Sequence, residues 1–138
     1  MPAIRRHIHI ATSPRAVWRA ISTSAGLQSW LAGAVRLEER VGGRVVLTFD
    51  PGGEPREERG MVHRWRPISH LEIAFDNIGE FDSKGTHVAF QITRDGDETR
   101  LSVIQSGGER LEDEEVRSRL DERWRLALAT LQEQLDRP

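Results

Sequence analysis

Hydrophobic and polar residues alternate in several short stretches of this chain, and strict alternation predicts a β-strand with one buried face. In residues 4–10, Ile8 and Ile10 lie on one face of such a strand, and His7 and His9 lie on the other. Similar stretches recur at 45–49, 61–65, 71–75, 88–92 and 101–103. Short turns separate most of them, so we expect about seven strands, or six, in an antiparallel meander, because parallel strands need long crossovers.

Turn signals rich in glycine mark the borders of these strands. Val41-Gly42-Gly43 is typical of a tight turn, and residues 50–55, with the sequence DPGGEP, predict a loop. Asp95-Gly96-Asp97 predicts a β-hairpin that joins the last two strands.

Two short helices are predicted directly after the first strand. Ser13 followed by Pro14 is typical of a helix start, as an N-cap and the first helical residue. The Ser-Thr-Ser stretch at 22–24 interrupts the helix, because these hydroxyl side chains bond to nearby backbone and favour caps. Its second or third residue can cap another helix, which we expect to end near Trp30.

One long helix is predicted at the end of the chain. Its first turn, 112–115, is acidic, which suits the positive end of the helix dipole. Apolar residues then follow at spacings of three and four, which places them on one face: Val116, Leu120, Trp124, Leu128, Leu131 and Leu135.

This order of elements predicts an α+β helix-grip fold. A curved antiparallel sheet has one apolar face to cover, and only the C-terminal helix is long enough to cover it. The two short helices can then close the open end, where Trp18 and Trp30 offer bulky apolar area.

Composition narrows the class of protein. The 138 residues fit one domain spanning 1–138, with 37% hydrophobic and 30% charged residues, as in soluble globular proteins. A net charge of −2 does not suggest nucleic-acid binding, and no apolar run reaches the roughly 18 residues of a membrane span. The absence of cysteine excludes disulfides and thiolate metal sites, and with no signal peptide we expect a cytoplasmic protein.

Eight segments, in this order and spacing, also carry a family resemblance: IATSPRAVWRAIS (10–22), QSWL (28–31), VGGRVVLTF (41–49), GMVHRWRP (60–67), HLEIAF (70–75), THVAFQI (86–92), ETRLSVIQSG (98–107) and ERWRLALATLQEQL (122–135). The chain resembles the superfamily of START lipid-transfer domains, polyketide cyclases and the birch pollen allergen (SRPBCC). More narrowly, it resembles the bacterial branch related to the activator of the ninety-kilodalton heat-shock chaperone's ATPase. The pattern departs from the family at Gln105, Gly108 and Phe75, where the family often has a histidine, an aromatic residue and a tryptophan.

The resemblance implies an internal cavity between the sheet and the long helix. Such pockets are mostly apolar, with a few polar groups that orient a ligand. The alternative is that the same side chains simply fill the core. The predicted ligand-binding residues are Trp30, Phe49, Met61, Trp65, Phe75, Phe90, Val103, Gln105, Trp124 and Leu128.

Two polar residues are candidates for contact with a ligand. Gln105 shares strand parity with Leu101 and Val103, so its amide is expected inside, bonded to a ligand or to the protein itself. His63 faces inward if the alternation with Met61 and Trp65 holds, and it would then be a possible acid or base. The family resemblance instead turns Val62 inward and His63 outward, and a β-bulge could reconcile the two patterns.

The remaining polar residues suggest no further chemistry. His7, His9 and His87 are expected to face solvent, and no pair of histidines has metal-site spacing, so neither a metal nor a cofactor is predicted. The carboxylates near 76–82 are expected at a solvated rim: Asp76, Glu80 and Asp82. The arginines of the long helix are expected on its solvated face: Arg117, Arg119, Arg123 and Arg125.

Three functions fit this sequence. The first is a module that binds a small hydrophobic molecule, lipid or aromatic, without catalysis. The second is an enzyme of the polyketide cyclase or hydrolase kind, in which only His63 could supply acid–base chemistry. The third, ranked last, is a chaperone-interaction domain, and a homodimer through exposed strand edges is compatible with each of them.

Overall fold

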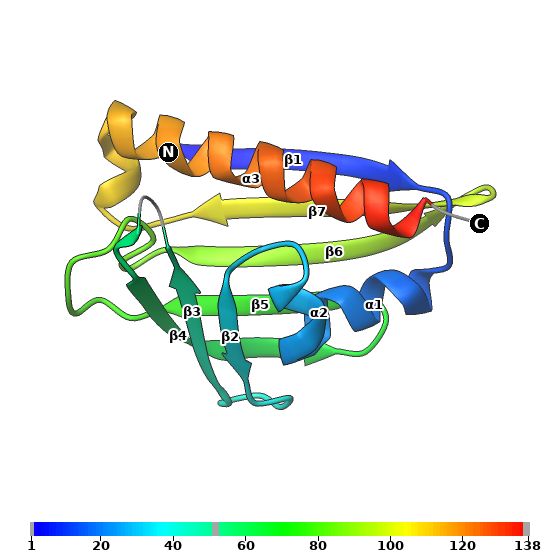
Figure 1. Ribbon diagram of the computed structural model, residues 1–138, viewed down its shortest axis with the longest axis horizontal. Helices are drawn as coiled ribbons and strands as arrows, with labels where there is room; N and C mark the ends of the chain where they lie inside the picture. Colours follow the sequence, from blue (N-terminus) through cyan, green and yellow to red (C-terminus); the bar gives the residue numbers. More distant parts are fainter. Residues whose placement is uncertain (1, 51–52, 137–138) are drawn as a thin grey trace.

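A single antiparallel sheet wraps around a long helix in the computed structural model, which describes residues 2–50 and 53–136 (Figure 1). Seven strands form the described sheet, in the spatial order β1-β7-β6-β5-β4-β3-β2, and all neighbours are antiparallel. The strands are β1 (Ala3–Ile10), β2 (Ala34–Leu37), β3 (Arg44–Phe49), β4 (Arg56–Arg66), β5 (His70–Phe75), β6 (His87–Asp95) and β7 (Glu98–Ser106). The predicted α+β helix-grip fold is confirmed.

The predicted turns lie where expected. Asp95 pairs with Glu98 across a two-residue hairpin loop, in which Gly96 has a φ of 64° that suits glycine. Residues 51 and 52 of the predicted 50–55 loop lie outside the described residues. The sheet also contains β2, a strand whose limits the alternation pattern did not give.

The two short helices are α1 (Pro14–Ser22) and α2 (Ser24–Gln28), and one threonine joins them. Thr23 Oγ1 accepts a hydrogen bond from the Gly26 N–H at 2.9 Å and donates one to the Arg19 carbonyl at 2.9 Å. A side chain at position 26 would bring its Cβ within 2.3 Å of that carbonyl, so glycine allows α2 to turn sharply against α1. The break in the helix is therefore held by local side-chain bonds, as predicted.

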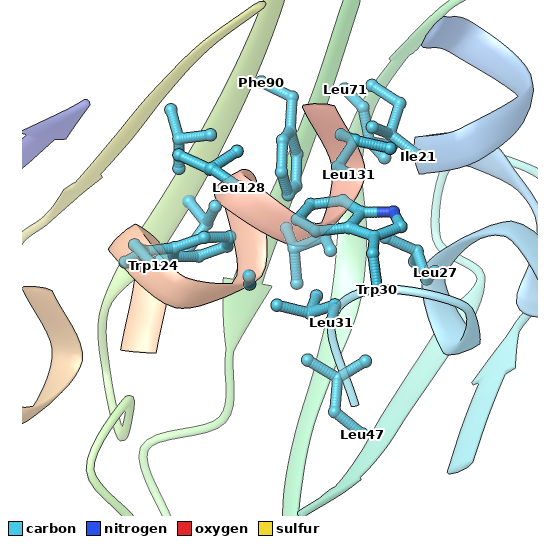
Figure 2. Packing of buried hydrophobic residues seen from close by; sticks show 14 of the residues in the cluster. Ile21, Leu27, Trp30, Leu31, Leu47, Leu71, Phe90, Trp124, Leu128 and Leu131 are labelled. Atoms are coloured by element: carbon cyan, nitrogen blue, oxygen red, sulfur yellow. The ribbon is translucent and has the colours of Figure 1, made fainter. Parts of the chain in front are cut away.

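The break directs Trp30 into the middle of the molecule. Its indole Nε1 donates to the Ala20 carbonyl of α1 at 2.9 Å, and its ring meets Phe90 edge-to-face, with centroids 6.4 Å apart. Figure 2 shows Trp30 surrounded by side chains of the sheet and of the C-terminal helix. In the middle of α1, Trp18 packs edge-to-face on Trp65 of β4, with centroids 5.1 Å apart. Both tryptophans are buried where the short helices meet the sheet.

The long helix is α3 (Glu114–Leu135), preceded by a short 3-10 turn, η2 (Arg110–Glu112). Asp113 caps it by accepting hydrogen bonds from the backbone of the first turn. Arg6 of β1 fixes the helix against the sheet through a two-bond pair with Asp121, at 2.8 and 3.0 Å. The predicted apolar stripe faces the sheet, and its first five members are buried. None of the helices in the described part of the chain is long and apolar enough to cross a membrane.

Candidate functional site

A small pocket lies between the sheet and α3, beside the last residue of β3. Four of its lining residues were predicted: Phe49, Phe75, Phe90 and Trp124. The sequence analysis missed the others, which are Leu31, Leu47, Ile73, Ser83, Val88 and Arg123. The cavity measures about 10 Å³, about the space of one water molecule. The aromatic side chains therefore fill most of the space that the fold encloses, and Phe90 meets Trp124 edge-to-face at 5.8 Å (Figure 2).

Arg123, which lines the pocket, belongs to an ion pair. Arg123 donates from Nη1 and Nη2 to the two carboxylate oxygens of Glu58, each at 2.9 Å. The Glu58 side chain is only 5% exposed, and that of Arg123 is 26% exposed. The guanidinium also lies over the Phe49 ring, 3.9 Å from its centroid, which is a cation–π contact. Arg123 and Phe49 together cover the pocket.

The placement of these two charged residues corrects the expectation for α3. Arg123 does not belong to a purely solvated face, because it flanks the apolar stripe three residues after Leu120 and adjoins Trp124. Glu58 faces inward because it alternates with the buried residues Gly60 and Val62 along β4. Alternation read back from Val62 could have identified Glu58, whereas its pairing with Arg123 had no signal in the sequence.

Gln105 is fully buried, as predicted, and its amide is bonded entirely to the protein. Its Oε1 accepts from Trp124 Nε1 at 2.8 Å. Its Nε2 donates to Ser83 Oγ and to Thr86 Oγ1, each at 3.0 Å. Ser83 Oγ also accepts from Arg123 Nη2 at 3.2 Å. A line of buried polar groups thus runs from the end of β7 to the ion pair at the edge of the pocket.

A second cluster holds the segment between β5 and β6 against α3. Asp82 accepts hydrogen bonds from Arg119 at 2.9 and 3.1 Å and from Arg110 at 2.9 Å. The bonds from Arg119, with a smaller contribution from Arg110, hold the pKa of Asp82 below its ordinary value, although burial opposes this shift. Asp82 is therefore part of a structural contact next to Ser83, and the predicted solvated rim does not describe it.

A β-bulge decides which residues of β4 face the pocket side. The pairing of β4 with β5 shifts register between Val62 and Arg64. Val62 is fully buried and Trp65 is half-buried, whereas Met61 is 42% exposed and His63 is exposed. The alternation that would place Met61 and His63 inside together with Trp65 is therefore wrong, and the alternative with Val62 inward, His63 outward and a bulge is confirmed, because the bulge inserts one residue and changes the parity between Val62 and Trp65.

His63 consequently lies on the outer face, where its ring contacts His87 at a centroid distance of 5.9 Å. Among the described residues, no group of three or more His, Asp or Glu side chains is arranged to hold a metal ion. The other predicted ligand-binding residues lie in the core but do not line the pocket: Trp30, Trp65, Val103, Gln105 and Leu128.

Comparisons with known proteins were made for sequence and for structure. No curated protein sequence matches this chain. Among solved structures, the Aha1 dimer of Colwellia psychrerythraea has a TM-score of 0.81 at 20% identity, over 99% of this chain and 97% of that chain. Protein MLL2253 of Mesorhizobium loti has a TM-score of 0.82 at 18% identity, over 97% and 96%.

DynU16, from the dynemicin biosynthetic locus, has a TM-score of 0.79 at 17% identity, over 99% of this chain and 48% of that chain. At such identities, these likenesses show the fold alone. The family model described as "Activator of Hsp90 ATPase homolog 1-like protein" matches residues 11–136, which is most of the sequence. The chain therefore belongs to the Activator of Hsp90 ATPase homolog 1-like family, a branch of the SRPBCC superfamily.

Proposed function

We propose that this protein binds one small hydrophobic molecule between the sheet and α3, at the pocket beside Phe49, Arg123 and Trp124. The observation that carries the proposal is the line of buried polar groups that ends in this otherwise apolar pocket. A few polar groups in an apolar recess are typical of ligand sites.

The closed state of the pocket sets a condition on binding. A cavity of about 10 Å³ does not admit a ligand larger than water, so a covering side chain has to move. Phe49 is only half-buried, and its contact with Arg123 is a cation–π contact worth about 0.5–2 kcal/mol. We therefore expect the pocket to open by displacement of the Phe49 ring. Because only molecules with an open pocket can bind, the apparent Kd equals the intrinsic Kd divided by the fraction of open molecules.

Native mass spectrometry on protein purified from its own host tests the proposal. A stoichiometric hydrophobic molecule, extracted and identified, would support it and give the ligand class. A clean ligand-free mass, together with no thermal shift across a panel of lipids and aromatic compounds, would contradict it. In that case the aromatic core would be simply packed.

Among the described residues, the pocket does not favour an enzyme of the cyclase or hydrolase kind. Glu58 and Arg123, the ionisable groups at this pocket, bond to each other, and His63 lies on the outer face. An acid or base needs a proton that it can exchange with a substrate. Catalysis therefore ranks below binding.

A chaperone-directed function also ranks below binding. It requires an exposed apolar or charged patch. The large exposed apolar residues of the described chain are few (Val41, Met61, Ile78 and Leu126), and the charged face of α3 fits a solvated surface.

The Colwellia protein is described as a dimer. We propose that this chain also self-associates, through the open edge of β2 or β1. Sedimentation across a range of protein concentrations tests this.

A further inference from the structure

Arg123 has one buried nitrogen, Nε, that makes no hydrogen bond within the described protein. Its two terminal nitrogens are engaged by Glu58, and Nη2 also donates to Ser83 Oγ. A buried donor without an acceptor is unfavourable. An acceptor that reaches Nε therefore gains a hydrogen bond to a charged group.

The planar guanidinium places this donor on the side of Ser83. Nε–H and one N–H of Nη2 share an edge of the group, as Arg6 illustrates by donating from both to Asp121. In Arg123, Nη2 donates to Ser83, which lines the pocket. The unused Nε–H thus lies on the edge of the guanidinium beside Ser83 Oγ.

Glu58 determines which charge a ligand can carry when it binds to this donor. The Arg123 charge is already balanced by a carboxylate that is almost fully buried. A second carboxylate, brought in by a ligand, would lie close to Glu58 in a medium of low dielectric constant, where repulsion is strong. A neutral oxygen avoids that repulsion and still accepts the hydrogen bond.

We propose that the pocket selects a neutral, mostly apolar ligand with one hydrogen-bond acceptor. This acceptor is a carbonyl or phenolic oxygen, to which Arg123 Nε donates. This inference rests on the proposed function and specifies its ligand class. The aromatic lining of Phe49, Phe75 and Phe90 favours a flat apolar body for that ligand.

Three naphthalene probes of similar size test the selection: 2-acetylnaphthalene with a carbonyl, 2-ethylnaphthalene without an acceptor, and 2-naphthoate with a carboxylate. Calorimetric titration gives each Kd, and the indole N–H signal of Trp124 in NMR spectra locates the binding. We expect the ketone to bind about tenfold more tightly than the hydrocarbon. The carboxylate should be the weakest of the three.

Two variants separate the donor from the charge. Arg123→Lys keeps a positive charge opposite Glu58 but has no Nε–H. The ratio of the Kd of the hydrocarbon to the Kd of the ketone should therefore fall to about one. Glu58→Gln removes the competing carboxylate, so naphthoate should become the tightest of the three probes. Arg119→Lys is the matched control, because Arg119 lies on the same helix, is half-exposed and bonds to Asp82 instead of the pocket residues. It should keep the wild-type order.

The outcomes distinguish this inference from the proposed function. If none of the probes binds the wild-type protein, the inference fails; the proposed function fails as well if native mass spectrometry also finds no ligand and no lipid or aromatic compound shifts the melting temperature. If the probes bind at Trp124 without preference, or if Arg123→Lys keeps the preference for the ketone, only the inference is overturned. Should Arg123→Lys fail to fold by circular dichroism, the result for Glu58→Gln decides alone, and an unchanged order refutes the inference.

Discussion

Replacement of Gln105 by methionine should destabilise the protein by about 2–3 kcal/mol. The substitution keeps the length of the side chain but removes both hydrogen-bonding ends of a fully buried amide. The Trp124 indole N–H then loses its acceptor, the Gln105 Oε1 atom 2.8 Å away, in a site where the tryptophan is 4% exposed. Leaving a buried donor unsatisfied costs about 1–3 kcal/mol.

The hydroxyl groups add less to this cost. Ser83 Oγ still receives the bond from Arg123, and Thr86 Oγ1 still donates to the Ser83 carbonyl at 2.6 Å. The loss is a large part of the roughly 5–15 kcal/mol by which a domain is stable. With a urea m-value of about 1–3 kcal/mol/M, the unfolding midpoint should fall by about 0.7–3 M.

Urea unfolding followed by circular dichroism measures this change, and a double-mutant cycle identifies its cause. In a Trp124→Phe background there is no indole N–H that could be left without an acceptor. Gln105→Met should therefore lower the free energy of unfolding by at least about 1 kcal/mol less than in the wild type. Gln91→Met, the same substitution at an exposed position of β6, is the control and should change stability by less than about 0.5 kcal/mol. An equal cost in both backgrounds would refute the role given to Trp124.

Two further predictions concern the contacts of Asp82 and the bulge in β4. Asp82→Asn should cost about 1 kcal/mol at pH 7, since Arg119 and Arg110 hold the folded pKa of Asp82 below its ordinary value of 3.8. This stabilisation is present above that value and is lost as the pH falls through the lower folded pKa, so melting curves of variant and wild type should converge as the pH is lowered below 3.8; a constant gap would contradict this. Met61→Lys should change the free energy of unfolding by less than about 0.5 kcal/mol, whereas Val62→Ala should lower it by about 2 kcal/mol. The reverse order in urea unfolding would place the bulge of β4 elsewhere.

Local patterns determined most of the fold. The apolar stripe of α3, the caps of α1 and α2, and the hairpin at Gly96 were all predicted, because each depends on residues within a few positions of one another. The inward position of Gln105 followed from strand parity in the same way. The order of these elements then left only one apolar face and one helix to cover it.

The alternation along β4 left its parity open, because the bulge after Val62 is a mismatch between two paired strands. Alternation alone placed Met61 and His63 inside, the family resemblance placed Val62 inside, and the pairing with β5 decides for Val62.

The polar side of the pocket likewise depended on contacts between distant segments. Glu58 and Arg123 are 65 positions apart, and each by itself is typical of a solvated surface. The sequence allowed either a cavity or a packed core, and the tertiary structure packs Trp30, Phe90 and Trp124 into that space. Which buried groups find partners, and how much space is left, depends on how all the elements pack together, and no local pattern encodes that packing.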